Sequence, residues 1–318
     1  MFFRKFFNLG FSVLLIAECA VFSSCFVNFV KINANERRSN NSAETDKITI
    51  TASFYPLYIM LLNLCDGTDL KPEMLAPSDT GCLHDYQLTT RDMQKISSSD
   101  CVVLNGAGME DFLDKVYESK KTSEGAVISA SDGFNSFVTD ADGAVNPHVW
   151  VSVDGAISQV NWISSKLAER YPSFSEKILK NAESYTKELE ELKTAMHSEL
   201  DKYRGETIIT FHEAFPYFAN EFGLSIAGVI EREPGTAPSP KELSEIIQFV
   251  DESNKAAVKK VPLFVEPQYS SASAEIISNE TGSAIYELDP CVTGVLEKDS
   301  YVKAMKKNLE VLRKAFAQ

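Results

Sequence analysis

The feature that most constrains the fold is a strand–helix alternation that occurs twice, on either side of one long helix. In residues 48–172 and again in residues 205–318, short β-branched runs such as ITITASF and TIITF alternate with helix-length segments. Alternation of this kind predicts parallel sheets flanked by helices. We therefore expect an α/β fold of two similar lobes, joined by one long rigid helix over residues 173–204.

The predicted joining helix has neither Gly nor Pro and carries an apolar stripe at helical spacing, with Glu and Lys on its other face. The stripe consists of Ile178, Tyr185, Leu189, Leu192, Met196 and Leu200. At a rise of about 1.5 Å per residue, such a helix extends beyond one small lobe. We expect a cleft between the lobes, where ligands bind at the carboxyl ends of the strands.

The charge balance excludes one class of partner. The formal net charge is −14, whereas a nucleic-acid-binding protein needs a basic face. A hydrophobic content of 44% is ordinary for a globular protein. The acidic balance fits a protein that attracts cations.

The N-terminal residues 1–30 read as an export or anchor segment, because basic residues in MFFRKFF precede an apolar run. Cys25, in FSSC, is a candidate lipid-bearing cysteine. The run 6–30 also has the length of about 20 apolar residues that an uncut membrane span needs. Residues 31–47 predict a flexible polar tether. In either case the body lies outside the cytoplasm, anchored to the outer face of the cell membrane.

Three of the four histidines occupy positions where α/β proteins bind ligands. His84 follows a predicted strand, His148 lies in NPHVW before a predicted helix, and His212 follows the strand TIITF. His197 is in the middle of the long helix, where a surface histidine is expected. The other three predict a site that only the tertiary fold assembles.

A carboxylate completes this set. Asp289 ends the predicted strand in YELDPC, at a position equivalent to that of His212. Imidazole nitrogens and a carboxylate oxygen suit tetrahedral zinc at about 2.0–2.2 Å, whereas manganese prefers more oxygen ligands. With His84 and His148 from the first lobe, this predicts a metal ion that bridges the lobes.

The pair His212-Glu213 does not indicate a zinc protease. A zincin helix needs a second histidine four residues after the first, and Pro216 stands there instead. The less favoured alternative is a zinc hydrolase with Glu213 or Glu266 as its base, which requires an open coordination position. We therefore expect a binding protein and not an enzyme.

Several motifs resemble those of one family. TGCLHDYQLT, NGAGMEDFLDK, NPHVWVS, TFHEAFPYFANEFGL, IEREPG and FVEPQYS followed by LDP are similar, in the same order, to motifs of the solute-binding lipoproteins of zinc and manganese ABC transporters. The closest resemblance is to the high-affinity zinc receptors of cluster A-I. It implies ligands at His84, His148, His212 and Asp289, small closure on binding, and delivery of the ion to a permease and its ATPase by a monomeric receptor.

The resemblance favours zinc over manganese. Manganese receptors of this family commonly have Glu where His212 stands. Many zinc receptors also have a histidine-rich loop, whereas SDGFNSFVTDADGAVNP contains no histidine here. A manganese-specific receptor and a metal-dependent surface adhesin remain the alternatives.

Cys82 and Cys291 each lie two residues from a proposed ligand. They are either a disulfide or two free thiols near the site, with free thiols favoured; Cys65–Cys101 is the other pairing. Glu213 is expected to hydrogen-bond a ligand histidine or to cap the following helix, and Glu266 is the other carboxylate in these motifs.

Overall fold

The computed structural model describes residues 47–83, 86–113, 126–139, 143–230, 238–256 and 259–317. The chain divides into Met1–Lys47 and a compact unit, Ile48–Gln318, which contains all the described helices and strands. Cys25, the predicted export segment and all of the predicted tether except Lys47 lie outside the described residues. Among the described helices, none combines the length and apolar character that crossing a membrane requires.

The first lobe contains the predicted parallel sheet, in the order β2-β1-β3-β4. Its strands are β1 (Ile48–Ala52), β2 (Leu70–Met74), β3 (Cys101–Leu104) and β4 (Val127–Ser129). Helix α2 (Tyr55–Leu64) follows β1, and α3 (Thr90–Ser98) follows β2. Thr89 and Asp92 form a capping box that fixes the start of α3.

The second lobe repeats this strand order as β6-β5-β7-β8, again parallel. Its strands are β5 (Thr207–Thr210), β6 (Ser225–Val229), β7 (Leu263–Val265) and β8 (Ile285–Glu287). Its helices are α7 (Pro216–Phe222), α8 (Pro240–Ala256) and α9 (Ala272–Thr281). The sequence predicts that α7 begins at Glu213, but it begins at Pro216, since proline fits the first helical position. Ser239 and Glu242 form a capping box at the start of α8.

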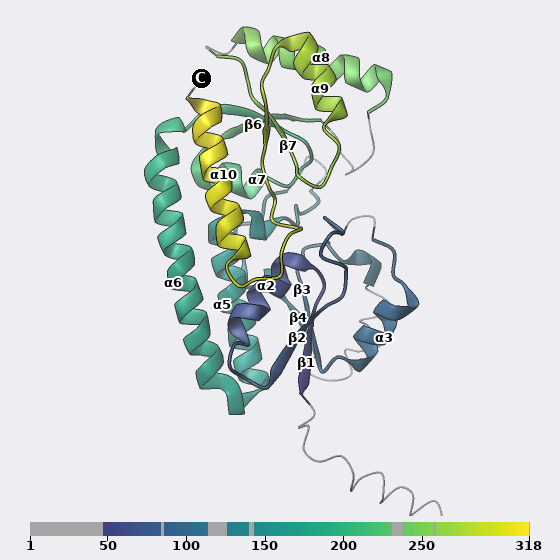
Figure 1. Cartoon of the computed structure of the whole chain (residues 1–318), viewed down its shortest axis with the longest axis vertical. Coiled ribbons are helices and arrows are strands. Elements are labelled where there is room, and N and C mark those ends of the chain that lie inside the picture. The colour runs from purple at the N-terminus through teal and green to yellow at the C-terminus, as the bar shows by residue number, and fades with distance from the viewer. Residues whose placement is uncertain are drawn as a thin grey trace, which may run out of the picture. The chain divides into compact units, whose positions relative to one another are not determined.

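The predicted joining helix is α6 (Ser175–Leu200), which short 3₁₀ turns extend at both ends (Figure 1). All the predicted stripe residues on α6 are buried. They face α5 (Val153–Arg170), α2 and the C-terminal helix α10 (Ser300–Phe316), all of which contact α6. The fold class expected from the sequence is confirmed.

The largest apolar core is shared by both lobes. One cluster of buried residues includes Ile50 of β1, Leu189 of α6, Phe218 of α7 and Met305 of α10. Smaller clusters cover the other face of each sheet, beneath α3 in the first lobe and beneath α8 and α9 in the second. Because the shared core is continuous, relative movement of the lobes requires repacking of buried side chains.

Buried hydrogen bonds also connect the lobes. The indole Nε1–H of Trp150 donates to the carbonyl oxygen of Pro290 at 2.8 Å. The Tyr301 hydroxyl of α10 donates to the carbonyl oxygen of Trp150 at 2.9 Å. Trp150 also makes an edge contact with Phe54 of the first lobe, with ring centroids 5.0 Å apart. Trp150 is therefore fixed by residues from both lobes.

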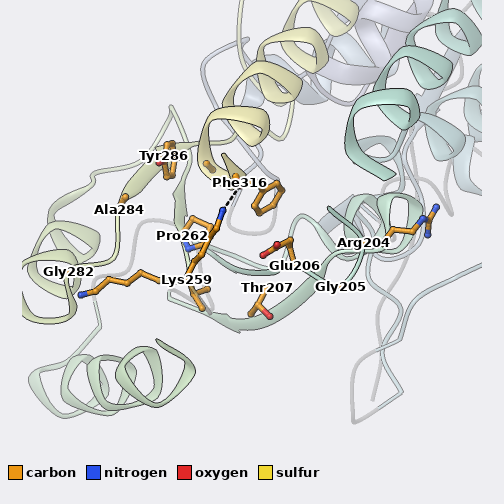
Figure 2. A pocket seen from close by; sticks show the side chains of 13 residues that line it. Arg204, Gly205, Glu206, Thr207, Lys259, Pro262, Gly282, Ala284, Tyr286 and Phe316 are labelled. Carbon is orange, nitrogen blue, oxygen red and sulfur yellow. Dashed lines mark hydrogen bonds between the residues drawn. The ribbon is translucent and has the colours of Figure 1, made fainter. Parts of the chain in front are cut away.

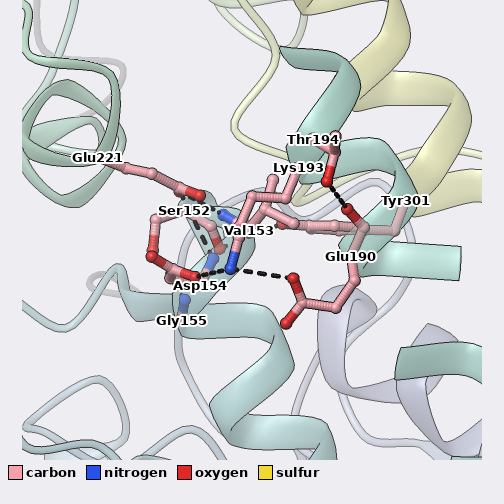
Figure 3. Close-up of polar contacts among 9 residues, drawn as sticks. All are labelled: Ser152, Val153, Asp154, Gly155, Glu190, Lys193, Thr194, Glu221 and Tyr301. Carbon is pink, nitrogen blue, oxygen red and sulfur yellow. Dashed lines mark hydrogen bonds and ion pairs between the residues drawn. The ribbon is translucent and has the colours of Figure 1, made fainter. Parts of the chain in front are cut away.

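A second connection lies at the N-terminus of α5 (Figure 3). The Val153 N–H donates to Oε2 of Glu221, on α7, at 2.8 Å. Burial raises the pKa of Glu221 to about 7, and the nearby charge of Asp154 adds to this shift. Lys193 of α6 donates to Oδ1 of Asp154 at 2.8 Å. Helices from both lobes and the joining helix thus meet at one helix terminus.

The apolar stripe of α6 predicts that two leucines of this helix contribute differently to the free energy of unfolding. Leu189 is fully buried, whereas Leu179 is 48% exposed on the same helix. Leu189→Ala is expected to lower the free energy of unfolding by about 2–5 kcal/mol, because it opens a cavity in the shared core. Leu179→Ala is expected to change it by less than about 0.5 kcal/mol. Chemical unfolding followed by circular dichroism measures both values; similar losses would contradict the assigned packing of α6.

Candidate metal centre

Three polar side chains follow the ends of neighbouring strands in the second sheet. His212 lies two residues after β5, Glu266 directly after β7, and Asp289 two residues after β8. Since these strands are adjacent and parallel, their carboxyl ends lie at one edge of the sheet. This is the edge at which α/β folds bind ligands.

The first lobe contributes residues from two loops. Cys82 lies in the loop after β2 and follows Gly81, whose φ of 83° is in the left-handed region that glycine adopts readily. His148 directly precedes the 3₁₀ turn Val149–Val151, which leads into α5. The side chain of His148 is therefore positioned by the same segment as Trp150.

Cys82, His148 and His212 form a cluster of potential metal ligands. One ligand atom from each of the three side chains lies within 4.8 Å of the others, and all three residues are buried. The two imidazole rings have centroids 5.2 Å apart. The Sγ of Cys82 lies 3.6 Å from Nε2 of His212. Residues from both lobes are thus close enough to bind one ion.

Hydrogen bonds orient both imidazoles. Nδ1 of His148 lies 3.0 Å from the amide Oδ1 of Asn146, which only accepts, so Nδ1 carries the proton. Nδ1 of His212 contacts the buried carboxylate of Glu266, and Gln268 donates to the other oxygen of that carboxylate at 2.7 Å. In each ring Nε2 is therefore the nitrogen through which a metal would be bound. The sequence does not predict this role of Asn146, although Asn146 precedes His148 in the NPH motif.

Burial and charge shift the pKa values of the cluster. Burial lowers the pKa of His212, but the charges and hydrogen bonds of Glu266 and Cys82 together outweigh this effect, and the pKa is raised. Burial also raises the pKa of the Cys82 thiol. A metal ion that binds these atoms therefore competes with protons at neutral pH.

Asp289 does not belong to the described cluster of Cys82, His148 and His212. Its Oδ1 accepts a hydrogen bond from the Cys291 N–H at 2.7 Å. Burial raises the pKa of Asp289, and the Glu266 carboxylate adds to this shift. Asp289 is thus at the same edge of the sheet, but its carboxylate is hydrogen-bonded to the backbone of Cys291.

The other residues singled out in the sequence have different surroundings. His84 lies outside the described residues. The side chain of Glu213 is exposed, and its backbone carbonyl accepts from Asn146 at 2.8 Å. His197 lies on α6 and its Nδ1 is 2.9 Å from Oδ1 of Asp201.

The four cysteines of the body, Cys65, Cys82, Cys101 and Cys291, are buried free thiols. Neither of the two disulfides considered for this chain is present among them. The thiol of Cys291 contacts the backbone carbonyl of Asp289, at 3.8 Å. Of these thiols, only that of Cys82 lies in the described metal-ligand cluster.

A cavity of about 720 Å³ lies at the opposite, amino edge of the second sheet (Figure 2). Thr207, Pro262 and Ala284 line it at or just before the starts of β5, β7 and β8. Lys259 projects into it and donates to the Phe316 carbonyl at 3.2 Å. This cavity is separate from the candidate metal centre, and its lysines do not suit a cation.

Comparison with known proteins identifies the family. Residues 50–315 match the family described as ZnuA, zinc-uptake complex component A, periplasmic. The chain belongs to the ZnuA family. This is a family of metal-uptake receptors and not of enzymes, and its periplasmic members agree with the expected location outside the cytoplasm.

Relatives of the ZnuA-family chain differ in the metal that they are named for. The sequence of this chain is 27% identical to that of the zinc-binding lipoprotein AdcA of Streptococcus pneumoniae, over 96% of this chain and 61% of AdcA. The chain thus spans about three fifths of that relative's length. It is also 27% identical to the manganese-binding lipoprotein MntA of Halalkalibacterium halodurans, over 74% of this chain and 78% of MntA.

A solved structure of similar fold is FpvC of Pseudomonas aeruginosa in complex with Ni²⁺. It has a TM-score of 0.75 and 28% sequence identity, and the match covers 86% of this chain and 97% of FpvC. The two-lobed arrangement of this ZnuA-family chain therefore has an experimentally determined counterpart that binds a divalent metal ion.

The contact between Glu266 and His212 predicts that Glu266 supports metal binding without touching the ion. Glu266→Gln is expected to weaken zinc binding by about 10–100-fold, the usual effect of losing the partner of a ligand histidine. Glu213→Gln is the matched control, because that side chain is exposed. Competition titration against a chelating zinc indicator measures both affinities. Equal affinities of the two variants would contradict the role assigned to Glu266.

Proposed function

We propose that this chain is the extracytoplasmic receptor of an ABC transporter, which captures a divalent metal ion and passes it to a membrane permease driven by an ATPase. The observation that carries the proposal is the buried cluster of Cys82, His148 and His212, which joins residues of both lobes within 4.8 Å. Membership of the ZnuA family supports the same function.

His148 and His212 are the central ligands of the proposed site through their Nε2 atoms, since Nδ1 of each ring contacts an orienting side chain. His84 and Asp289 are the further ligands implied by the family motifs. Four protein ligands fill a tetrahedral shell and leave no position for an activated water, so such a site captures an ion and does not hydrolyse a substrate.

Zinc is the proposed cargo. The potential ligand atoms of Cys82, His148 and His212 are sulfur and nitrogen atoms, which bind zinc well. Manganese prefers a coordination shell rich in oxygen. The names of relatives do not decide this, since both zinc-binding and manganese-binding lipoproteins are similar to the chain.

Membrane attachment is proposed through the N-terminal segment, either by lipid on Cys25 or by an uncut apolar span over residues 6–30. The receptor acts as a monomer that meets its permease at the membrane surface. Attachment keeps the receptor close to the permease and raises its effective concentration there.

Two histidines provide a direct test of the ligand assignment. His212→Ala is expected to lower zinc affinity by orders of magnitude, because it removes a ligand from the buried cluster. His197→Ala is expected to leave it nearly unchanged, because His197 lies on α6 beside Asp201. Calorimetric zinc titration of the purified variants measures the difference. If both variants bind zinc equally, His212 is not a ligand.

The raised pKa of His212 sets the direction of the pH dependence. A raised pKa means that the metal-free imidazole keeps its proton to higher pH, so zinc must displace this proton below that pKa. Zinc affinity is therefore expected to rise between about pH 5 and 7.5, by about tenfold per pH unit for each proton released. Titrations in several buffers measure this slope. Constant affinity over that range would count against histidine ligation.

A further inference from the structure

Cys82 occupies a distinct position among the cysteines of the body. Its Sγ is 3.6 Å from Nε2 of His212, whose other ring nitrogen contacts Glu266. Its thiol is free and belongs to the same cluster as His148. The thiols of Cys65, Cys101 and Cys291 are also buried, but they belong to no histidine cluster in the residues that the structure describes.

The distance from Sγ of Cys82 to Nε2 of His212 matches the distance between two ligand atoms of one tetrahedrally coordinated ion. With Zn–S of about 2.3 Å and Zn–N of about 2.0–2.1 Å, tetrahedral angles place the sulfur and nitrogen about 3.5–3.6 Å apart. The observed 3.6 Å agrees with this value. All three donor atoms of the cluster lie within 4.8 Å of one another, so binding of one ion draws the third donor closer to the other two.

The surroundings of Cys82 favour metal binding over simple packing. The sulfur faces a polar cluster formed by His212, whose ring is fixed by Glu266, and by His148, whose ring is fixed by Asn146. Both imidazoles are 2% exposed or less, so water does not compete for their nitrogens as it does at the surface. Soft thiolate ligands favour zinc over manganese, which prefers hard oxygen donors.

We propose that Cys82 is a metal ligand, whose thiolate sulfur enters the shell beside His148 and His212 and makes the site selective for thiophilic divalent ions such as zinc over manganese. This proposal rests on the receptor function proposed above and specifies its cargo. Cys82 then takes one of the two positions that the family motifs assign to His84 and Asp289, and only one of those two residues fills the remaining tetrahedral position.

The binding step is an exchange of a proton for a metal ion. The S–H bond of Cys82 breaks, its electron pair stays on sulfur and forms the S–Zn bond, and the proton passes to solvent. No oxidant or reductant takes part, and the charge of the metal ion is unchanged. A free thiol is required, so the protein must be reduced before metal is added.

Cobalt(II) is a suitable probe, because a thiolate bound to it gives a near-ultraviolet sulfur-to-metal charge-transfer band, and tetrahedral Co²⁺ gives visible d–d bands. The full chain, reduced and metal-free, is titrated with Co²⁺ alone. Wild type is expected to show both features at one ion per chain. Cys82→Ser is expected to lose the charge-transfer band, whereas Cys65→Ala, a buried thiol outside the cluster, is expected to keep it.

The outcomes separate this proposal from the receptor function. Visible bands at one ion per chain without a charge-transfer band in wild type would overturn the role of Cys82 and leave the receptor function intact. No cobalt or zinc binding by wild type would overturn both. A charge-transfer band that persists in Cys82→Ser would also overturn the proposal, since another thiol would then be the ligand.

Competition between ions tests the selectivity. Cys82→Ser is expected to weaken zinc binding at least tenfold and manganese binding much less, so the ratio of zinc to manganese affinity falls. Circular dichroism of the metal-free variant confirms that it is folded. An unchanged affinity ratio in a folded Cys82→Ser variant would contradict the assigned selectivity.

Discussion

The shared apolar core fixes the relative position of the two sheets, and the metal centre depends on it. Buried side chains from β1, α6, α7 and α10 belong to one cluster, and Trp150 is hydrogen-bonded to Pro290 across it. His148 lies two residues before Trp150, and Asp289 directly precedes Pro290. Packing of the core therefore also positions the residues of the candidate metal centre.

Hydrogen bonds fix the orientation of the histidines in the candidate metal centre. Asn146 and Glu266 each fix one imidazole, and Gln268 in turn holds Glu266. Fixed side chains lose little further conformational freedom on binding, which leaves more of the interaction energy for affinity. The loop at Gly81 places the thiol of Cys82 against His212 of the second lobe.

Most of the fold could be predicted from the sequence, because the spacing of apolar residues and the composition of each segment depend on local structure. The stripe on α6 and the capping boxes of α3 and α8 depend on near neighbours in the chain. The position of His212 could also be predicted, since a residue that follows a strand lies at the edge of a parallel sheet.

Other contacts depend on residues that are far apart in sequence. Cys82 and His212 are separated by 130 positions, and a single loop cysteine has no spacing that indicates a metal site. The partner of each histidine is equally hard to infer. Glu213 adjoins His212 in the chain but is exposed, whereas Glu266 reaches the ring from a neighbouring strand. Sequence proximity is thus a poor guide to which carboxylate orients an imidazole.

The C-terminal helix α10 adds a second connection beside α6. It contacts both α6 and α2, and its Tyr301 bonds to the segment that precedes α5. A single helix between lobes permits swivelling about its axis, whereas two packed helices resist twisting as well as bending. In the proposed receptor, the loaded and empty forms would then present nearly the same outline to the proposed permease. The permease would have to recognise the loaded form by local changes around the metal. Dissociation of the metal would have to depend on displacement of individual side chains.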